Sequence, residues 1–85
     1  MNIPEHRKLI DKLDAQIVRL LNERTKHVLA IGDMKRKAGE EIYAPHRERA
    51  VLQRICRNNQ GPLTNDSLRA IYREVCPAPC RFRRR

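Results

Sequence analysis

The feature that most constrains the fold is one long segment with helical periodicity. It runs from Pro4 to about Ala38, and Gly39 supplies a stop. Its apolar positions are Leu9 or Ile10, Leu13, Ile17, Leu20 or Leu21, Val28, Ile31 and Met34. Some 34 residues at about 1.5 Å each predict a helix of about 50 Å, which is longer than a domain of this size is wide. A single chain cannot cover such a stripe, so we expect a partner helix.

Two shorter helices are predicted after a connector that ends at Pro45. The first presents Val51, Leu52, Ile55 and Cys56 on one face and ends at Gly61-Pro62. Thr64 is suited to cap the next helix, with Leu63 and Leu68 spaced as a hydrophobic staple. That helix carries Leu68, Ile71, Tyr72 and Val75, and Pro77 should end it near Val75 or Cys76.

The sequence therefore predicts an all-α fold of one long and two short helices. We assign residues 1–76 to one helical domain. Residues 77–85 form a separate tail, rich in Pro, Cys and Arg, which we expect to be irregular or disordered because it has no helical apolar period.

The charge of the chain favours an anionic partner. The net charge is +9, but four arginines lie in the last five residues, so residues 1–76 carry fifteen cations against ten anions. That excess suits a small dicarboxylate, an acidic protein or nucleic acid. No uncharged run reaches the roughly 18 apolar residues of a membrane span, and charges interrupt any signal-peptide core. We expect a cytoplasmic protein with no membrane association.

The three cysteines do not indicate a metal centre. Cys76 and Cys80 have a loose spacing, but no second pair of cysteines or histidines completes a zinc set. There is also no glycine-rich phosphate loop. We therefore expect no metal site.

Two cations occupy the apolar stripe of the long helix. The series Ile17, Leu21, Arg24, Val28, Ile31, Lys35 is spaced 4, 3, 4, 3 and 4. A long cationic side chain often extends its charged end from the edge of such a stripe to water. Here, however, Arg24 and Lys35 lie on nearly one line, about 16 Å apart along the helix.

The second helix adds two charges that can also face inward. Arg47 and Glu48 each precede an apolar position by four residues, Val51 and Leu52 respectively. Three cations and one carboxylate around one interior space need a counter-charge, because unpaired buried charge costs several kcal/mol. A bound dianion would provide it.

These residues resemble the all-helical AroQ class of chorismate mutases, especially the form fused to prephenate dehydratase. The resemblance covers about residues 5–75. The matching pieces are R-x-x-I-D-x-L-D (Arg7 to Asp14), L-L-N-E-R (Leu20 to Arg24), I-G-x-x-K (Ile31 to Lys35), P-x-R-E (Pro45 to Glu48) and N-Q-G-P-L (Asn59 to Leu63).

The resemblance implies an intertwined homodimer with shared active sites that converts chorismate to prephenate without a cofactor. Arg24 and Arg47 would bind the substrate carboxylates, and Lys35 would contact the ether oxygen and a carboxylate. Glu48 would hold the substrate hydroxyl. Arg7 would reach into the site of the partner chain. The implied catalytic residues are thus Lys35, Glu48 and Arg24, and the substrate-binding set adds Arg7 and Arg47.

The chain also departs from the family pattern. The family often has an acid at the position of Ala44. Its third helix supplies a hydroxyl residue and then a Gln or Glu, which would fall near Pro79 and Arg83 here. We expect the altered end of the third helix to weaken activity.

Other functions remain open from the sequence. An isochorismate-pyruvate lyase would use the same cations, and a catalytically silent regulatory domain would bind without turnover. A prephenate dehydratase is a candidate for a fused enzyme missing from this chain. A basic nucleic-acid-binding module is disfavoured because Tyr43, Tyr72 and Phe82 are the only aromatic residues available for stacking.

Overall fold

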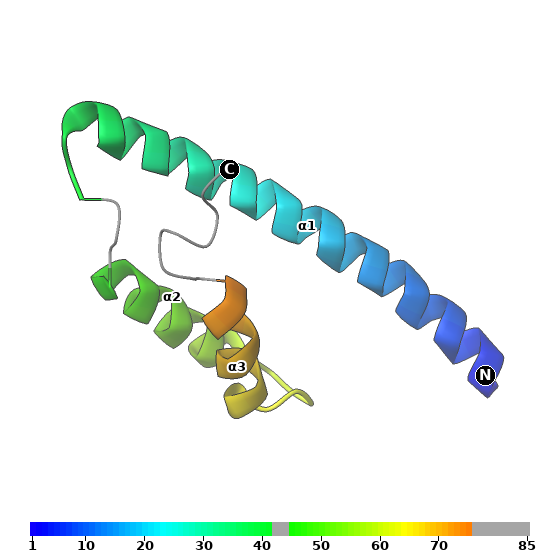
Figure 1. Ribbon diagram of the computed structural model, residues 1–85. Helices are drawn as coiled ribbons and strands as arrows, with labels where there is room; N and C mark the ends of the chain where they lie inside the picture. The colour runs from blue at the N-terminus through cyan, green and yellow to red at the C-terminus, as the bar shows by residue number, and fades with distance from the viewer. Residues whose placement is uncertain (42–44, 76–85) are drawn as a thin grey trace. The chain divides into compact units, whose positions relative to one another are not determined.

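The computed structural model describes residues 1–41 and 45–75 (Figure 1). These residues form three helices: α1 (Ile3–Ala38), α2 (Pro45–Asn58) and α3 (Asn65–Val75). No strand occurs within the described ranges. The prediction of an all-α chain with one long and two short helices is confirmed. The expected stop at Pro77 and the tail of residues 77–85 lie outside the described residues.

Helix α1 spans 36 residues and ends at Ala38, directly before Gly39. Gly39 has a φ of +73°, a left-handed conformation that glycine adopts without steric cost. The Gly39 N–H donates to the Arg36 carbonyl at 3.2 Å, and the Glu40 N–H donates to the Lys35 carbonyl at 2.8 Å. This pair of bonds is a Schellman motif, which satisfies carbonyls that the end of the helix leaves without partners. The predicted stop at Gly39 is confirmed.

The chain divides into two units within α1, between Ile31 and Gly32. The first unit, Met1–Ile31, consists almost entirely of helix. We define its apolar face as five side chains on one side of the helix that are each about half exposed: Leu9 (45%), Leu13 (54%), Ile17 (52%), Leu20 (55%) and Ile31 (53%). These five side chains of the predicted stripe are thus about half exposed, and the partner helix expected to cover them stays a prediction.

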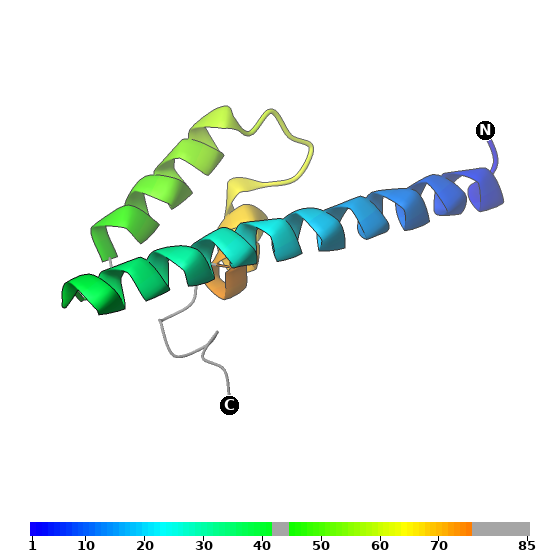
Figure 2. The same ribbon diagram turned by 90° about the horizontal axis from the view of Figure 1, so that it is seen from above.

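Helices α2 and α3 belong to the second unit and pack against each other (Figure 2). Val51 on α2 is only 4% exposed and is the buried apolar side chain of the described residues. The half-buried neighbours on the two helices are Leu52, Ile55, Cys56, Leu68, Tyr72 and Val75. Ile71, predicted as part of the same apolar set, is instead 48% exposed. Fewer apolar side chains of α3 are thus packed than its sequence pattern predicts.

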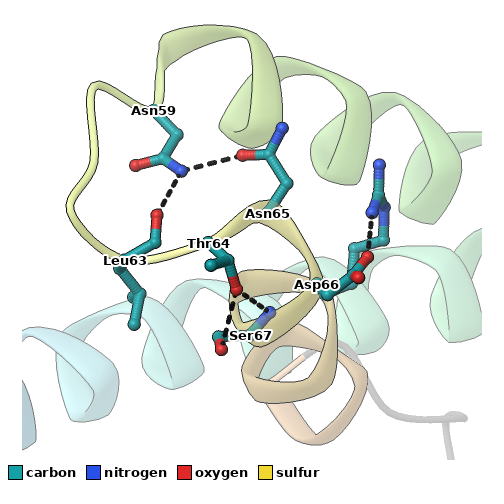
Figure 3. Close-up of polar contacts among 7 residues, drawn as sticks. Asn59, Leu63, Thr64, Asn65, Asp66 and Ser67 are labelled. Carbon is teal, nitrogen blue, oxygen red and sulfur yellow. Dashed lines mark hydrogen bonds and ion pairs between the residues drawn. The ribbon is translucent and has the colours of Figure 1, made fainter.

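The connection between α2 and α3 is organised by Asn59 (Figure 3). Its side-chain amide donates to the Leu63 carbonyl at 2.7 Å and to Asn65 Oδ1 at 2.8 Å. Its Oδ1 accepts the Gly61 N–H at 3.0 Å. Gly61 has a φ of +73°. One side chain therefore ties the end of α2 to the first residue of α3. Helix α2 stops at Asn58, three residues before the predicted stop at Gly61.

Thr64 caps α3 as the sequence predicts (Figure 3). Its hydroxyl accepts the Ser67 N–H at 3.1 Å, and its carbonyl accepts the Leu68 N–H at 3.0 Å. The side-chain bond satisfies a donor at the start of α3 that has no partner within the helix. The staple between Leu63 and Leu68 stays a prediction, since Leu63 is 47% exposed.

Candidate active site

Charged side chains in the described residues are exposed, with three exceptions. Arg24, Lys35 and Glu48 are half-buried, whereas every other Lys, Arg, Asp and Glu of residues 1–41 and 45–75 is exposed. Removing a charge from water is unfavourable unless a partner compensates. These three are the residues that the sequence nominates for catalysis. Their partial burial is an observation, and their roles stay predictions.

Arg24 lies on a half-buried stretch of α1 within the first unit. Thr25, Val28 and Leu29 share its half-buried state. The Thr25 hydroxyl donates to the Leu21 carbonyl at 2.8 Å, so this polar side chain is satisfied within the helix. Arg24 therefore lies on a part of α1 that is partly shielded from water. This shielding strengthens the electrostatic interaction of Arg24 with an anion.

Lys35 lies in the last turn of α1, within the second unit. No carboxylate of residues 1–41 or 45–75 forms an ion pair with its ammonium group. The nearby Asp33 carboxylate instead pairs with Arg36 at 2.8 Å, and both of those side chains are exposed. Three positions before Lys35, Gly32 is buried. A mid-helix glycine costs roughly 0.5–1 kcal/mol relative to alanine, but it permits close approach to the helix backbone.

The first turn of α2 places Glu48 and Arg47 differently. We expected both to face inward, but Glu48 is half-buried and Arg47 is exposed. Glu48 precedes the buried Val51 by three residues and the half-buried Leu52 by four, so it lies on the packed face. Arg47 is about 100° further round the helix and lies at the edge of that face. Its long side chain extends to water from there.

The other arginine of this turn has a partner of its own. Arg49 Nη2 lies 2.9 Å from Nδ1 of His46, one turn earlier on the exposed side of α2. Glu48 takes no part in the ion pairs of the described residues, such as Arg19–Glu23, Asp33–Arg36 and Asp66–Arg69. The Glu48 carboxylate is thus half-buried without a cation partner in the described residues, and its oxygens can accept a hydrogen bond from a ligand.

Arg7 is exposed on α1, far along the helix from Lys35. The two residues are 28 positions apart on one helix, which corresponds to about 42 Å at the usual rise. Within one chain they cannot contact the same small molecule. If Arg7 belongs to the same site as Lys35, a second chain must supply it.

Several sequence predictions lie outside the described residues. They concern Ala44, Pro79 and Arg83, and the cysteines Cys76 and Cys80. Within the described part, no three His, Cys, Asp or Glu side chains are grouped in a way that could hold a metal ion. No helix there is both long and apolar enough to cross a membrane.

Sequence reasoning missed two polar features that the structure reveals. One is the Asn59 cluster between α2 and α3. The other is a reciprocal pair of bonds between Asn2 and Glu5 at the start of α1. The second had a signal in the sequence, because Asn followed by Glu three residues later is typical of a capping box at a helix start.

Comparison with known proteins gives consistent results. The family described as chorismate mutase type II matches residues 6–83. Over 70 residues the chain is 50% identical to a bifunctional chorismate mutase/prephenate dehydratase of Neisseria gonorrhoeae, covering 82% of this chain and 19% of that protein. The corresponding protein of Aquifex aeolicus is 42% identical over 80 residues, covering 89% of this chain and 22% of the relative. The chain thus spans about a fifth of the length of these curated relatives.

A solved structure shows a likeness in fold as well as in sequence. The chorismate mutase of Thermus thermophilus, in its form I structure, superposes with a TM-score of 0.83 at 32% sequence identity. The match covers 86% of this chain and 91% of that one.

Proposed function

Because the chain belongs to the chorismate mutase type II family, we propose that it catalyses the rearrangement of chorismate to prephenate. This reaction serves the biosynthesis of phenylalanine and tyrosine, and we assign it to the cytoplasm. It breaks one C–O bond and forms one C–C bond within a single molecule. It needs no nucleophile, general base or cofactor, so the protein must act by folding the substrate and stabilising charge.

The observation that carries this proposal is the partial burial of Arg24, Lys35 and Glu48 alone among the charged side chains of the described residues. Chorismate carries two carboxylates, an ether oxygen and a hydroxyl. Two cations and one carboxylate acceptor match those groups in kind. A shielded position makes each contact stronger than it would be at the exposed surface.

Each residue has a distinct role in the proposed mechanism. Arg24 and Arg47 bind the two carboxylates and hold the enolpyruvyl group over the ring, which supplies the chair-like geometry that the reaction needs. Lys35 donates to the ether oxygen, where negative charge grows as the C–O bond breaks. Because this charge is largest in the transition state, Lys35 stabilises the transition state more than the ground state. Glu48 accepts a hydrogen bond from the substrate hydroxyl.

We further propose that two chains share each site. Arg7 is about 42 Å from Lys35 along α1, whereas a chorismate-sized ligand is much shorter. If both residues bind one substrate, they come from different chains with their long helices antiparallel. The half-exposed apolar face of α1 supports this assembly, because a second α1 would remove those side chains from water.

The proposed reaction is tested by following chorismate loss and prephenate formation with the purified full chain. Isochorismate is supplied in a parallel assay, with pyruvate release as the readout. Saturable prephenate formation supports the proposal. Pyruvate release from isochorismate without prephenate formation would identify a lyase, and binding of chorismate without turnover would identify a regulatory domain. Since the relatives of Neisseria gonorrhoeae and Aquifex aeolicus are named for both activities, we propose that a prephenate dehydratase consumes the product.

A further inference from the structure

The first turn of α1 is closed by two reciprocal hydrogen bonds. The Asn2 side-chain Oδ1 accepts the Glu5 N–H at 2.9 Å, and the Glu5 carboxylate accepts the Asn2 N–H at 3.0 Å. The Asn2 carbonyl also accepts the His6 N–H at 3.1 Å, which begins the regular ladder of the helix. This arrangement is a capping box, with Asn2 as the N-cap and Glu5 at the third helical position.

The capping box provides acceptors for most of the backbone N–H groups at the start of α1. A helix begins with backbone N–H groups that have no carbonyl four residues earlier. Two of these donors, those of Asn2 and Glu5, bond to side chains. Pro4 has no N–H to satisfy. Ile3 is then the remaining early donor, and it lies at the exposed surface, where water can bond to it.

Arg7 depends on this turn more than any other residue of the proposed site. It follows Glu5 by two positions, and in an α-helix its N–H bonds to the carbonyl of Ile3. Helix ends fray, and the effects of caps and end charges fall off within about one turn. The rest of the 36-residue helix does not need the box to stay helical. Loss of the box therefore acts on the turn that carries Arg7.

We propose that Asn2 and Glu5 are positioning residues for Arg7. Their reciprocal bonds keep the first turn helical, so that the Arg7 guanidinium is held in place for the substrate bound by the partner chain. The inference rests on the proposed function, which assigns Arg7 to that substrate. When only a fraction of the chains has the turn formed, the apparent substrate affinity falls to that fraction of its full value. In this proposal Arg7 adds a second contact to one of the substrate carboxylates, which is charged in both the ground state and the transition state, so the effect belongs to binding.

The experiment compares variants of the full chain in the chorismate assay. Asn2→Ala removes the side-chain acceptor, and Asn2→Ser restores one that is favoured at N-caps. Asn2→Ala should raise KM for chorismate about threefold or more, as expected if the turn is formed in about a third of the chains, with kcat changed less than about twofold. Asn2→Ser should return KM close to the wild-type value. Asn22→Ala, a matched change at an exposed mid-helix asparagine, should leave both constants unchanged.

A double variant separates positioning from general stabilisation. In the Arg7→Ala background, Asn2→Ala should cause no further rise in KM, because the affected side chain is already gone. Hydrogen exchange gives a readout independent of activity. The Glu5 and Arg7 amides should exchange faster in Asn2→Ala, while the Val28 amide should exchange as in the wild type.

The possible failures are distinguishable. A wild-type chain that does not convert chorismate overturns both the proposed function and this inference. An Arg7→Ala variant with an unchanged KM removes Arg7 from the site and overturns the inference with it. If Arg7→Ala is impaired but Asn2→Ala is not, the inference alone is wrong. An equal loss from Asn2→Ala in both backgrounds would show that the box only stabilises the fold, which also overturns it.

Discussion

The first thirty-one residues and the α2–α3 pair solve the problem of burying apolar surface in different ways. Residues 1–31 form one helix whose apolar face is about half exposed. Helices α2 and α3 contact each other, bury Val51 and are joined by the bonds of Asn59. The α2–α3 pair packs within its own unit, whereas the partner of the α1 apolar face is a proposal.

This difference shows which parts of the fold a single chain can specify. Helices of 14 and 11 residues are too short to be stable alone in water, so α2 and α3 depend on packing and on their caps. Helix α1, with 36 residues, is long enough to form without such packing, and we propose that its apolar face contacts a second chain. Four experiments test this difference between the two regions, and each changes a different part of the molecule.

The largest effect should follow from placing charge on the apolar face of α1. In Leu13→Glu/Leu20→Glu, a dimer interface would contain four carboxylates without partners, which is strongly unfavourable. We expect a monomer in sedimentation experiments and no detectable mutase activity. The matched control is Ala15→Glu/Asn22→Glu, which places the same charges at the same spacing on the opposite side of the helix. If both double variants have the same oligomeric state and the same activity, the apolar face does not have the proposed role.

The next largest effect should come from Lys35 in the second unit. Lys35→Ala removes the ammonium group that we propose donates to the ether oxygen, and it leaves the apolar face unchanged, so dimer and helicity should persist. The loss of a preorganised donor of this kind typically lowers kcat by about 10²–10³. Circular dichroism and sedimentation check the fold, and steady-state kinetics measure the rate. Lys37→Ala, an exposed change two residues later, is the control. A loss of less than about threefold would rule out the proposed role.

A smaller but more specific effect should follow from mixing two inactive variants. Arg7→Ala chains and Lys35→Ala chains that exchange subunits should give hybrids as half of all dimers. In each hybrid one site receives both changes and the other receives neither. About one quarter of wild-type activity should therefore return, being half of the dimers times half of their sites. No recovery, despite hybrids detected by mass spectrometry, would contradict shared sites.

The smallest effect should come from the loop between α2 and α3. Asn59→Ala removes three hydrogen bonds and leaves the Leu63 carbonyl without this donor. We expect a loss of about 1–3 kcal/mol in stability, with a fall in Tm of several degrees at fixed protein concentration. Asn58→Ala, an exposed neighbour, should have little effect. Equal Tm values for the two variants would show that the loop bonds do not hold α3 in place.

The sequence predicted the helices well because their signals are local. Gly39 needs only its own backbone freedom to end α1, and Thr64 needs only the following turn to cap α3. The end of α2 was placed too late because Asn59 bonds forward into the loop, and periodicity does not contain that information.

The candidate site was predicted unevenly for a related reason. Helical spacing was enough to mark Arg24, Lys35 and Glu48, and all three are half-buried. Arg47 also precedes an apolar residue by four positions, but it lies at the edge of the α2 face and is exposed. In the proposed assembly Arg7 contacts the substrate of a second chain, so neither its spacing nor the fold of one chain determines its place in the site.

The exposed apolar face of α1 also has a consequence for dilution. If the partner of this face is another chain, folding and association are one equilibrium that is second order in protein, and stability depends on concentration by mass action. Specific activity would then fall as the enzyme is diluted below its dissociation constant, and helicity would fall with it. Substrate would oppose both losses, because binding at a shared site holds the two chains together. For such a protein the amount in the cell determines the fraction that is folded, as well as the number of active sites.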